Sequence, residues 1–341
     1  MKNIDKTISK NETMDAMILY QQSTPLVFTE TNIPEINDEQ VLVKVEACGL
    51  CRTDLHIIDG ELKNPKLPLI PGHQIVGKVV KTGKNVRNLN MSDRVGIPWL
   101  GHTDGSCKFC LKGLENLCDN PIFTGYTMDG GFAEYTAGYS DFCFKLPQNK
   151  DAKSLAPLLC AGLIGYRSYS MIDKDAENIG IYGFGSSAHI ISQIASLEGK
   201  RIYAFTSPGD VEAQKFALKY GAIWANDSTQ NPPIKLDAAI IFAPAGKLVI
   251  SALKNIEKGG IVVCGGIHMS DIPSFSYKDL WEERKIVSVA NLTRKDGFEF
   301  FKKIENINIE IKVNEFELKD LNIAINLLRD GKITGSQVVV F

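Results

Sequence analysis

A short glycine-rich turn sets the expected fold of the second half of this chain. The turn reads Gly183-Phe184-Gly185-Ser186-Ser187-Ala188, and it separates the apolar strand Ile179–Tyr182 from a helical stretch. In a βα unit the first glycine permits a tight turn, the second lets backbone approach a pyrophosphate, and the small third residue packs helix against strand. The helix N-terminus adds N–H groups and a dipole that favour an anion. The turn predicts a dinucleotide site; the alternative is a purely structural βα turn.

The two halves of the chain have different patterns of expected strands and helices. From Ala16 to about Leu146 short strands are broken by Gly and Pro, which predicts a β-rich half, with strands expected at 41–45, 77–80, 93–97 and 132–135. After Asp151 apolar strands alternate with helical patterns, with strands expected at 179–182, 201–205, 237–242, 260–264 and 286–289. Such alternation predicts a parallel sheet wrapped by helices, and therefore an α/β fold.

The last segment differs from both halves. We expect a helix at 296–304, a strand at 309–313, a helix at 318–329 and a strand at 338–340. Because 341 residues exceed what one core usually organises, two domains are expected, with a boundary near residue 160.

Composition excludes several classes of function. A net charge of -2 and a pI near 6.3 provide no overall attraction for phosphate backbones or anionic lipid, so neither nucleic acid nor membrane is an expected partner. No apolar run approaches the roughly 20 residues that span a bilayer. Residues 1–14 are polar and lack the apolar core of a secretory signal, which predicts a cytoplasmic protein with a disordered N-terminal tail.

The end of the second expected parallel strand bears on the choice of dinucleotide. NAD-binding units place an acidic residue there to hold the ribose 2′-hydroxyl. This strand ends in Thr206 and Ser207, and no carboxylate stands at that point. Two hydroxyl groups could donate to a 2′-phosphate without repelling it, so we hypothesise that NADP(H) is preferred. NAD(H) use, or use of both, is the alternative.

The cysteines cluster in a way that suggests metal. Eight cysteines are too sparse for a disulfide scaffold, but Cys107, Cys110 and Cys118 lie close together in sequence with Asp104 just before them. Four such donors in one loop suit a structural zinc ion, because no coordination position is left for a substrate. Three free thiols are the alternative, and His102 is the other nearby donor.

A second candidate metal set is dispersed along the chain. Cys51, His73 and Cys160 would supply two sulfurs and an imidazole, which leaves a fourth zinc position open, as in catalytic sites. Spacing alone does not assemble these residues, since a lone cysteine is usually a small core residue.

Several separated motifs carry a family resemblance. They are Gly49-Leu50-Cys51-Arg52-Thr53-Asp54-Leu55-His56, Pro71-Gly72-His73, the 107–118 cysteine loop, Gly125-Tyr126 with 130–135, Cys160-Ala161-Gly162 and Gly183-Phe184-Gly185. Their order resembles that of zinc-dependent alcohol dehydrogenases of the medium-chain dehydrogenase/reductase superfamily, over essentially the whole chain after the tail.

The resemblance implies a domain organisation. A GroES-like β-rich catalytic domain would cover residues 1–159, a Rossmann coenzyme domain with a doubly wound parallel sheet would cover 160–294, and 295–341 would return to the catalytic domain. It also implies two zinc ions per chain and a homo-oligomer, either a dimer or a tetramer.

The resemblance further implies roles for single residues. Cys51, His73 and Cys160 would hold the catalytic zinc, and Asp104, Cys107, Cys110 and Cys118 the structural zinc. Asp54 would orient the histidine ligand, and Thr53 with His56 would relay a proton. Arg52 would meet the coenzyme pyrophosphate.

The expected substrate pocket is less well defined. Trp99 resembles a pocket wall of the family, and Ile58 stands where small-alcohol enzymes often have Trp. A smaller side chain there implies room for medium-chain or aromatic primary alcohols, although Ile58 could instead be core. Gln74 departs from the family, whose members usually carry Glu after the histidine ligand.

The expected function is therefore an NAD(P)-dependent zinc alcohol dehydrogenase acting on an alcohol or aldehyde. A polyol- or formaldehyde-type zinc dehydrogenase of the same superfamily is the alternative enzyme. A non-catalytic NADPH-binding module is the alternative from a different class.

Overall fold

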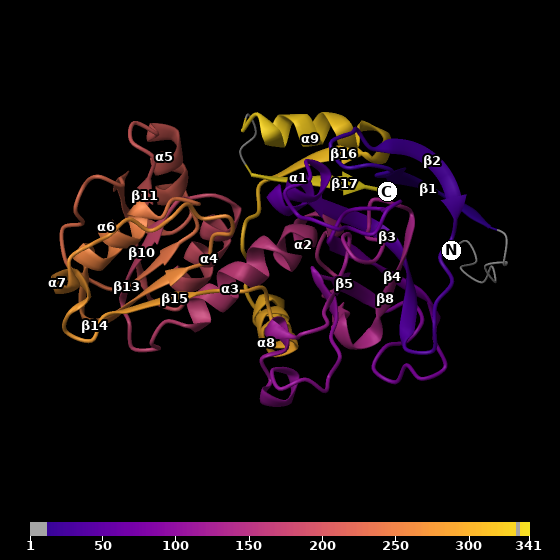
Figure 1. The fold of residues 1–341 in the computed structure, drawn as a ribbon, viewed down its shortest axis with the longest axis horizontal. Helices are drawn as coiled ribbons and strands as arrows, with labels where there is room; N and C mark the ends of the chain where they lie inside the picture. The colour runs from indigo at the N-terminus through magenta and orange to yellow at the C-terminus, as the bar shows by residue number, and fades with distance from the viewer. Residues whose placement is uncertain (1–11, 332–334) are drawn as a thin grey trace. The chain divides into compact units, whose positions relative to one another are not determined.

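The computed structural model of the chain describes residues 12–331 and 335–341 (Figure 1). The chain divides into two compact units. The first unit comprises the residues as far as Cys160 together with the segment from Lys312 onward, and the second comprises Ala161–Ile311.

The first unit is rich in β-structure. Its strands are β1 (Thr13–Ile18), β2 (Val27–Asn32), β3 (Gln40–Leu50), β4 (Gln74–Thr82), β5 (Arg94–Ile97), β6 (Leu100–His102), β7 (Ile122–Phe123), β8 (Tyr135–Tyr139), β9 (Phe144–Lys145), β16 (Val313–Glu317) and β17 (Ser336–Val340). Its helices are α1 (Arg52–Ile58), η1 (Cys110–Lys112), η2 (Glu115–Leu117), η3 (Ser140–Phe142), α2 (Ala152–Leu155), η4 (Ala156–Leu159), η5 (Leu318–Asp320) and α9 (Leu321–Arg329).

Strand β3 organises the first unit. The main sheet runs in the order β16-β17-β3-β4-β5-β9, and β8 also pairs with β3. The C-terminal β17 is an apolar strand whose Val338 and Val339 are buried, and it pairs antiparallel with β3, so that Gln337 lies opposite Leu50. Figure 1 shows the yellow C-terminal strand and α9 beside the indigo N-terminal elements. The chain end thus supports the strand that leads directly into Cys51.

The second unit is built on a parallel sheet. Its strands are β10 (Asn178–Tyr182), β11 (Arg201–Thr206), β12 (Ala222–Asp227), β13 (Leu236–Ile241), β14 (Ile256–Cys264) and β15 (Lys285–Ser288), in the order β12-β11-β10-β13-β14-β15. This order reverses direction next to β10, as in dinucleotide-binding sheets. The first strand is buried at four of its five residues, as expected for a strand covered on both faces.

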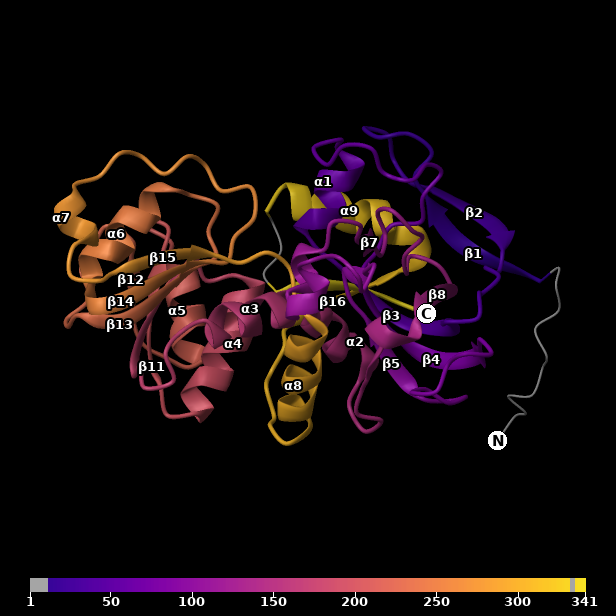
Figure 2. The same ribbon diagram turned by 60° about the horizontal axis from the view of Figure 1, so that its bottom comes forward.

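Helices cover both faces of this sheet. They are α3 (Ala161–Ser170), α4 (Ser186–Leu197), α5 (Val211–Lys219), α6 (Lys247–Asn255), α7 (Tyr277–Leu280) and α8 (Arg294–Glu305). Right-handed crossovers place α4 and α5 on one face and α6 on the other, as Figure 2 shows. The face under α6 is filled by an apolar core that includes Tyr182, Phe205, Ile241 and Val249.

The sequence expectations for the fold were confirmed for the α/β class with a β-rich and a parallel-sheet half. The second unit extends to Ile311 rather than 294, because α8 packs on α3 through Phe300 and Tyr166. Most of the expected tail 1–14 lies outside the described residues, and its last residues enter β1.

Three local expectations differ from the structure. The strand expected at 309–313 begins only at Val313. The strand expected at 132–135 begins at Tyr135, because the residues before it run through a Gly-rich loop. Strand β12 was not expected, because it lies at the edge of the sheet and only its first residue is buried. Within the described ranges, no helix is both long and apolar enough to cross a membrane.

We predict that Tyr182→Phe destabilises the second unit. The Tyr182 ring is fully buried against Phe205, and its hydroxyl accepts a hydrogen bond from Asn255 Nδ2 at 3.0 Å. Removing the hydroxyl leaves a buried amide N–H unsatisfied, which should lower the free energy of unfolding by about 1–3 kcal/mol. Urea unfolding followed by tryptophan fluorescence measures this change, with Trp224 near Phe205 as a reporter.

Tyr203→Phe is the matched control, since Tyr203 is also buried in this sheet and its hydroxyl makes no hydrogen bond recorded among the described residues. Equal stability losses in the two variants would contradict the role of the Asn255 contact.

Candidate functional site

Three donors from distant parts of the chain meet in the first unit. The Sγ atom of Cys51 lies 3.2 Å from His73 Nε2 and 3.8 Å from Cys160 Sγ, and all three donor atoms lie within 4.8 Å of one another. Tetrahedral zinc with sulfur at about 2.3 Å and nitrogen at about 2.05 Å would separate two sulfurs by about 3.8 Å, and sulfur from nitrogen by about 3.6 Å. The donor set therefore fits a zinc ion.

Helix α1 positions the first donor. Cys51 is its N-cap, where its Sγ accepts a hydrogen bond from Thr53 N at 3.3 Å, and Asp54 Oδ2 accepts one from Cys51 N at 2.9 Å. This reciprocal arrangement is a capping box in which a sulfur stands in for the usual hydroxyl. The helix N-terminus also favours a negatively charged sulfur.

The second donor is oriented by a buried carboxylate. His73 Nδ1 donates to Asp54 Oδ1 at 3.2 Å, and neither side chain is exposed to solvent. This bond turns Nε2 toward Cys51. Burial alone lowers the pKa of His73, but the Asp54 carboxylate and the Cys51 sulfur together raise that pKa well above its usual range. Asp54 therefore acts on the imidazole through both orientation and charge.

The two sulfurs have opposite electrostatic situations. A hydrogen bond from Cys160 lowers the pKa of the Cys51 thiol well below its usual range despite the opposing effect of burial. The same contact, together with burial, raises the pKa of Cys160. Two thiolates this close repel each other unless a cation lies between them, and a coordinated divalent ion deprotonates both thiols. The chemistry of the donor set thus also fits zinc.

Polar side chains follow Cys51 along α1. Arg52 is exposed, Thr53 is half-buried beside Cys51, and His56 lies one turn further along the helix. His56 Nδ1 makes a short contact with the carboxylate of Glu61. The helix therefore brings the three expected residues to one segment, and it adds Glu61 as an unexpected partner.

The two expected pocket residues have different environments. Trp99 is half-buried, and its ring packs edge-on against the His73 imidazole with the centroids 5.1 Å apart. The ring also stacks with Phe123 and Tyr126. Ile58, by contrast, is 3% exposed and belongs to the apolar core of the first unit. This burial favours the core alternative for Ile58.

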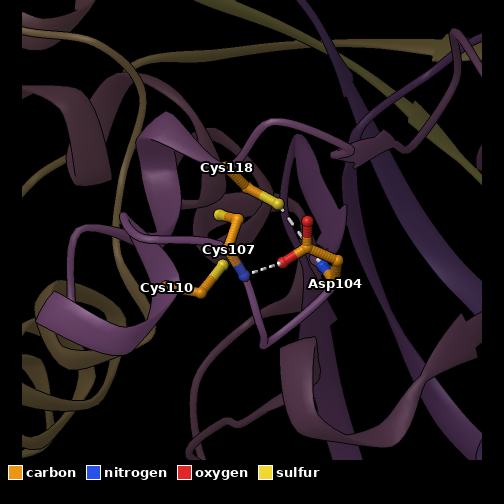
Figure 3. Close-up of side chains that lie close together, drawn as sticks. All are labelled: Asp104, Cys107, Cys110 and Cys118. Atoms are coloured by element: carbon orange, nitrogen blue, oxygen red, sulfur yellow. Dashed lines mark hydrogen bonds between the residues drawn. The ribbon is translucent and has the colours of Figure 1, made fainter.

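The four donors expected in the loop 104–118, called the lobe below, also come together. Donor atoms of Asp104, Cys107, Cys110 and Cys118 lie within 4.8 Å of one another, and Figure 3 shows the side chains converging. His102 is not in this group; it stacks on Tyr139 instead. Helices η1 and η2 fold the loop back on itself, which brings Cys118 to the other three donors.

Asp104 is held firmly within the lobe. Its Oδ1 accepts from the backbone N–H groups of Ser106 and Cys107 at 2.9 Å each, and Asn120 Nδ2 donates to Oδ2 at 3.1 Å. These bonds, led by that of Cys107, hold the pKa of the carboxyl well below its usual range. Burial raises the pKa of Cys110 to about 12. A cation is needed to ionise Cys110 as well, so this donor set also fits zinc.

The glycine-rich turn has the geometry of an anion cradle. Gly183 has a φ of +87°, and a Cβ there would lie 2.7 Å from Ala243 Cβ. A Cβ on Gly185 would meet nothing within 4 Å, so its surface is open. In the described part of the chain no side chain caps α4, and the dipole at the N-terminus of this helix favours an anion. Ala188 is fully buried under the turn.

The end of β11 is polar, with one hydroxyl buried and the next exposed. Thr206 is 3% exposed, its hydroxyl lies 3.3 Å from Ser207 O, and it accepts from Gln214 Nε2 at 3.3 Å. Ser207 is exposed. Ser207 can therefore reach a bound molecule directly, whereas the Thr206 hydroxyl is already engaged inside the protein.

Sequence reasoning missed Glu61 and Gln214. Glu61 lies five residues after His56 in a loop, and Gln214 lies on a helix eight residues after Thr206. Neither spacing belongs to a recognised motif. The His56–Glu61 contact and the Gln214–Thr206 hydrogen bond could be identified only from the structure.

Comparison with known proteins places this geometry in context. Residues 37–148 match the family described as Alcohol dehydrogenase GroES-like domain. The chain is 42% identical over 323 residues to a probable alcohol dehydrogenase, AdhA, of Mycobacterium tuberculosis, covering 93% of each chain. It is 34% identical over 336 residues to an alcohol dehydrogenase of Geobacillus stearothermophilus, covering 96% of this chain and 98% of the relative.

A solved structure is similar in fold. The CAD from Helicobacter pylori, complexed with NADP(H), superposes with a TM-score of 0.83 at 23% sequence identity, covering 96% of this chain and 98% of that chain.

We predict that Gly185→Ala weakens dinucleotide binding and leaves folding intact. The new methyl group meets no protein atom, but it occupies the surface where backbone must approach a pyrophosphate. The expected result is an unchanged melting temperature with dinucleotide affinity at least about tenfold weaker, since a blocked contact of about 1.4 kcal/mol gives that factor. Equilibrium dialysis and thermal unfolding measure the two quantities.

Unchanged dinucleotide affinity in Gly185→Ala would count against this turn as the binding site.

We predict that Asp54→Asn loosens zinc at Cys51, His73 and Cys160. The carboxylate orients His73 and also accepts from Cys51 N, and outer-shell partners of this kind typically contribute about 10–100-fold to metal affinity. Zinc transfer to a chromogenic chelator measures the loss. Asp59→Asn, an exposed carboxylate at the other end of α1, should release zinc as the unaltered protein does. Equal release from both variants would remove Asp54 from the metal site.

Proposed function

We propose that this chain, which belongs to the zinc-dependent alcohol dehydrogenases of the medium-chain dehydrogenase/reductase superfamily, interconverts primary alcohols and aldehydes at the Cys51, His73 and Cys160 site. Family membership makes the chain an NAD(P)-dependent oxidoreductase. The proposal concerns the residues that perform the reaction, the preferred coenzyme and the substrate class.

The observation that carries the proposal is the convergence of three donors with Asp54 behind them. Two sulfurs and one imidazole leave one tetrahedral position for a substrate oxygen, which is the pattern of catalytic zinc. The second zinc would lie in the lobe of Asp104, Cys107, Cys110 and Cys118, whose four donors leave no open position. We therefore propose two zinc ions per chain.

Zinc bound at the three donors would supply Lewis acidity that lowers the pKa of an alcohol hydroxyl. The protein's own residues then handle the proton. Thr53 lies beside Cys51, so its hydroxyl Oγ1 is the proposed first acceptor. His56, one turn along α1, is the proposed exit. Its Nδ1 contacts the carboxylate of Glu61.

The second unit would hold the coenzyme. The open surface of Gly185 and the N–H groups of α4 suit a pyrophosphate, with Phe184, Ser186, Ser187 and Ala188 completing the turn. Arg52 on α1 is the proposed cation for the same phosphates. We propose that NADP(H) is preferred over NAD(H), because β11 ends in Thr206 and Ser207 with no carboxylate at that point.

Trp99 supports a proposal about the substrate. Its half-buried ring beside His73 offers an apolar wall next to the donors, which suits medium-chain or aromatic primary alcohols. A polyol carries several hydroxyl groups and gains little from an indole wall. The polyol-type alternative is therefore less well supported by this geometry, and the formaldehyde-type alternative stays open.

Compartment and assembly are also proposals. All eight cysteines are unpaired in the structure, which suits the reducing cytoplasm. We propose a homo-oligomer, a dimer or tetramer, on the basis of family membership.

Initial rates of benzaldehyde reduction with NADPH and with NADH, before and after zinc chelation, test the proposal. We expect turnover that favours NADPH and is lost on chelation, and greater activity on benzyl alcohol than on ethanol in the reverse direction. Cys51→Ala and His73→Ala should each abolish turnover, because each removes one of three donors. Metal analysis should find one zinc fewer per chain in each variant.

Cys143→Ala is the control, since Cys143 belongs to neither donor set, is buried, and has an Sγ that donates to Tyr139 O. Wild-type turnover per bound zinc in Cys51→Ala or His73→Ala would overturn the ligand assignment. A preference for NADH would overturn only the coenzyme choice, and a strong preference for ethanol only the substrate class.

A further inference from the structure

The end of β11 contains a hydrogen bond that no sequence motif indicates. Gln214, on α5, donates from Nε2 to Thr206 Oγ1 at 3.3 Å. Thr206 is the last residue of β11, at the point where NAD-binding sheets place a carboxylate. The buried Thr206 hydroxyl and the half-buried Gln214 amide therefore lie where an NAD-binding sheet has a carboxylate that contacts the ribose.

The amide retains hydrogen-bonding capacity. A glutamine side chain has two N–H donors and a carbonyl oxygen. Within the part of the chain that the structure describes, the bond to Thr206 is the only one that the Gln214 side chain makes. A second N–H could donate to a phosphate oxygen, and the carbonyl could accept from a ribose hydroxyl. The residue is thus suited to contact the adenosine end of a coenzyme.

The carboxylates nearby are already engaged. Asp210 Oδ1 caps α5 by accepting from Ala213 N at 2.9 Å, and Asp227 Oδ1 accepts from Thr229 N at 2.8 Å. Glu212 pairs with Lys215 at 2.8 Å on the same helix. These contacts hold each carboxylate within its own turn without removing the charge of Asp210 or Asp227, and the uncharged Gln214 is the side chain bonded directly to the strand end.

We infer that Gln214 is a specificity-determining residue for the coenzyme, holding the Thr206 hydroxyl and adding no negative charge beside the 2′-position of the adenosine ribose. This inference rests on the proposed preference for NADP(H). A carboxylate at position 214 would repel the 2′-phosphate and would accept from the 2′-hydroxyl of NAD(H). A cation there would do the opposite.

Gln214→Glu and Gln214→Lys test the inference with opposite signs. The ratio of kcat/KM for NADPH to that for NADH should fall about tenfold or more in Gln214→Glu and should rise in Gln214→Lys, since charges a few ångströms apart at a surface interact by about that factor. Fluorescence titration with NADPH and NADH should show the same changes in Kd, without any need for turnover. Gln148→Glu, an exposed site in the other unit, is the control for added charge.

The outcomes distinguish the role of Gln214 from the proposed preference for NADP(H). A wild-type preference for NADPH with opposite shifts in the two variants supports the inference. A wild-type preference for NADPH with both variants within twofold of it, at unchanged melting temperature, overturns the inference and leaves the proposed coenzyme intact. If Gln214→Glu does not fold, Gln214→Lys alone decides, because an unchanged or lowered ratio contradicts the charge argument. A wild-type preference for NADH overturns the coenzyme proposal and this inference with it.

Discussion

The buried carboxylate of Asp54 connects the parts of the first unit on which the site depends. It accepts one hydrogen bond from Cys51 N, which starts α1, and another from His73 Nδ1, which precedes β4. Because Asp54 has no exposed surface, its charge is balanced only by these groups and by whatever cation the donors hold. A single side chain thus couples the start of a helix, the orientation of an imidazole and the charge of a metal site.

The two donor sets differ in how they are assembled, and this decides how much the sequence could predict. Asp104, Cys107, Cys110 and Cys118 lie in one loop, so their spacing alone indicated a lobe. Cys51, His73 and Cys160 come together only because β3, β4 and η4 pack against one another. No local pattern carries that information, and family resemblance was needed to join them.

The same distinction runs through the fold. The strands with continuous apolar runs, such as β10 and β13, were predictable because both faces of a parallel sheet are buried. The edge strand β12 was not, since most of its residues are partly exposed and its pattern resembles a loop. The Gln214–Thr206 bond was invisible in sequence because a side-chain contact between a helix and a strand end leaves no periodic signal.

The charge near the Cys51, His73 and Cys160 donors gives a physical reason for the neutral Gln74 beside His73. Cys51, Cys160 and Asp54 would together carry three negative charges against the two positive charges of a zinc ion. Gln74 is 3% exposed and its amide lies over Gly49, where a Cβ would come within 2.8 Å of Oε1. A carboxylate buried at this point would add a fourth negative charge. The neutral amide keeps the net charge of the site near -1, while the missing side chain at Gly49 supplies the space that the amide needs.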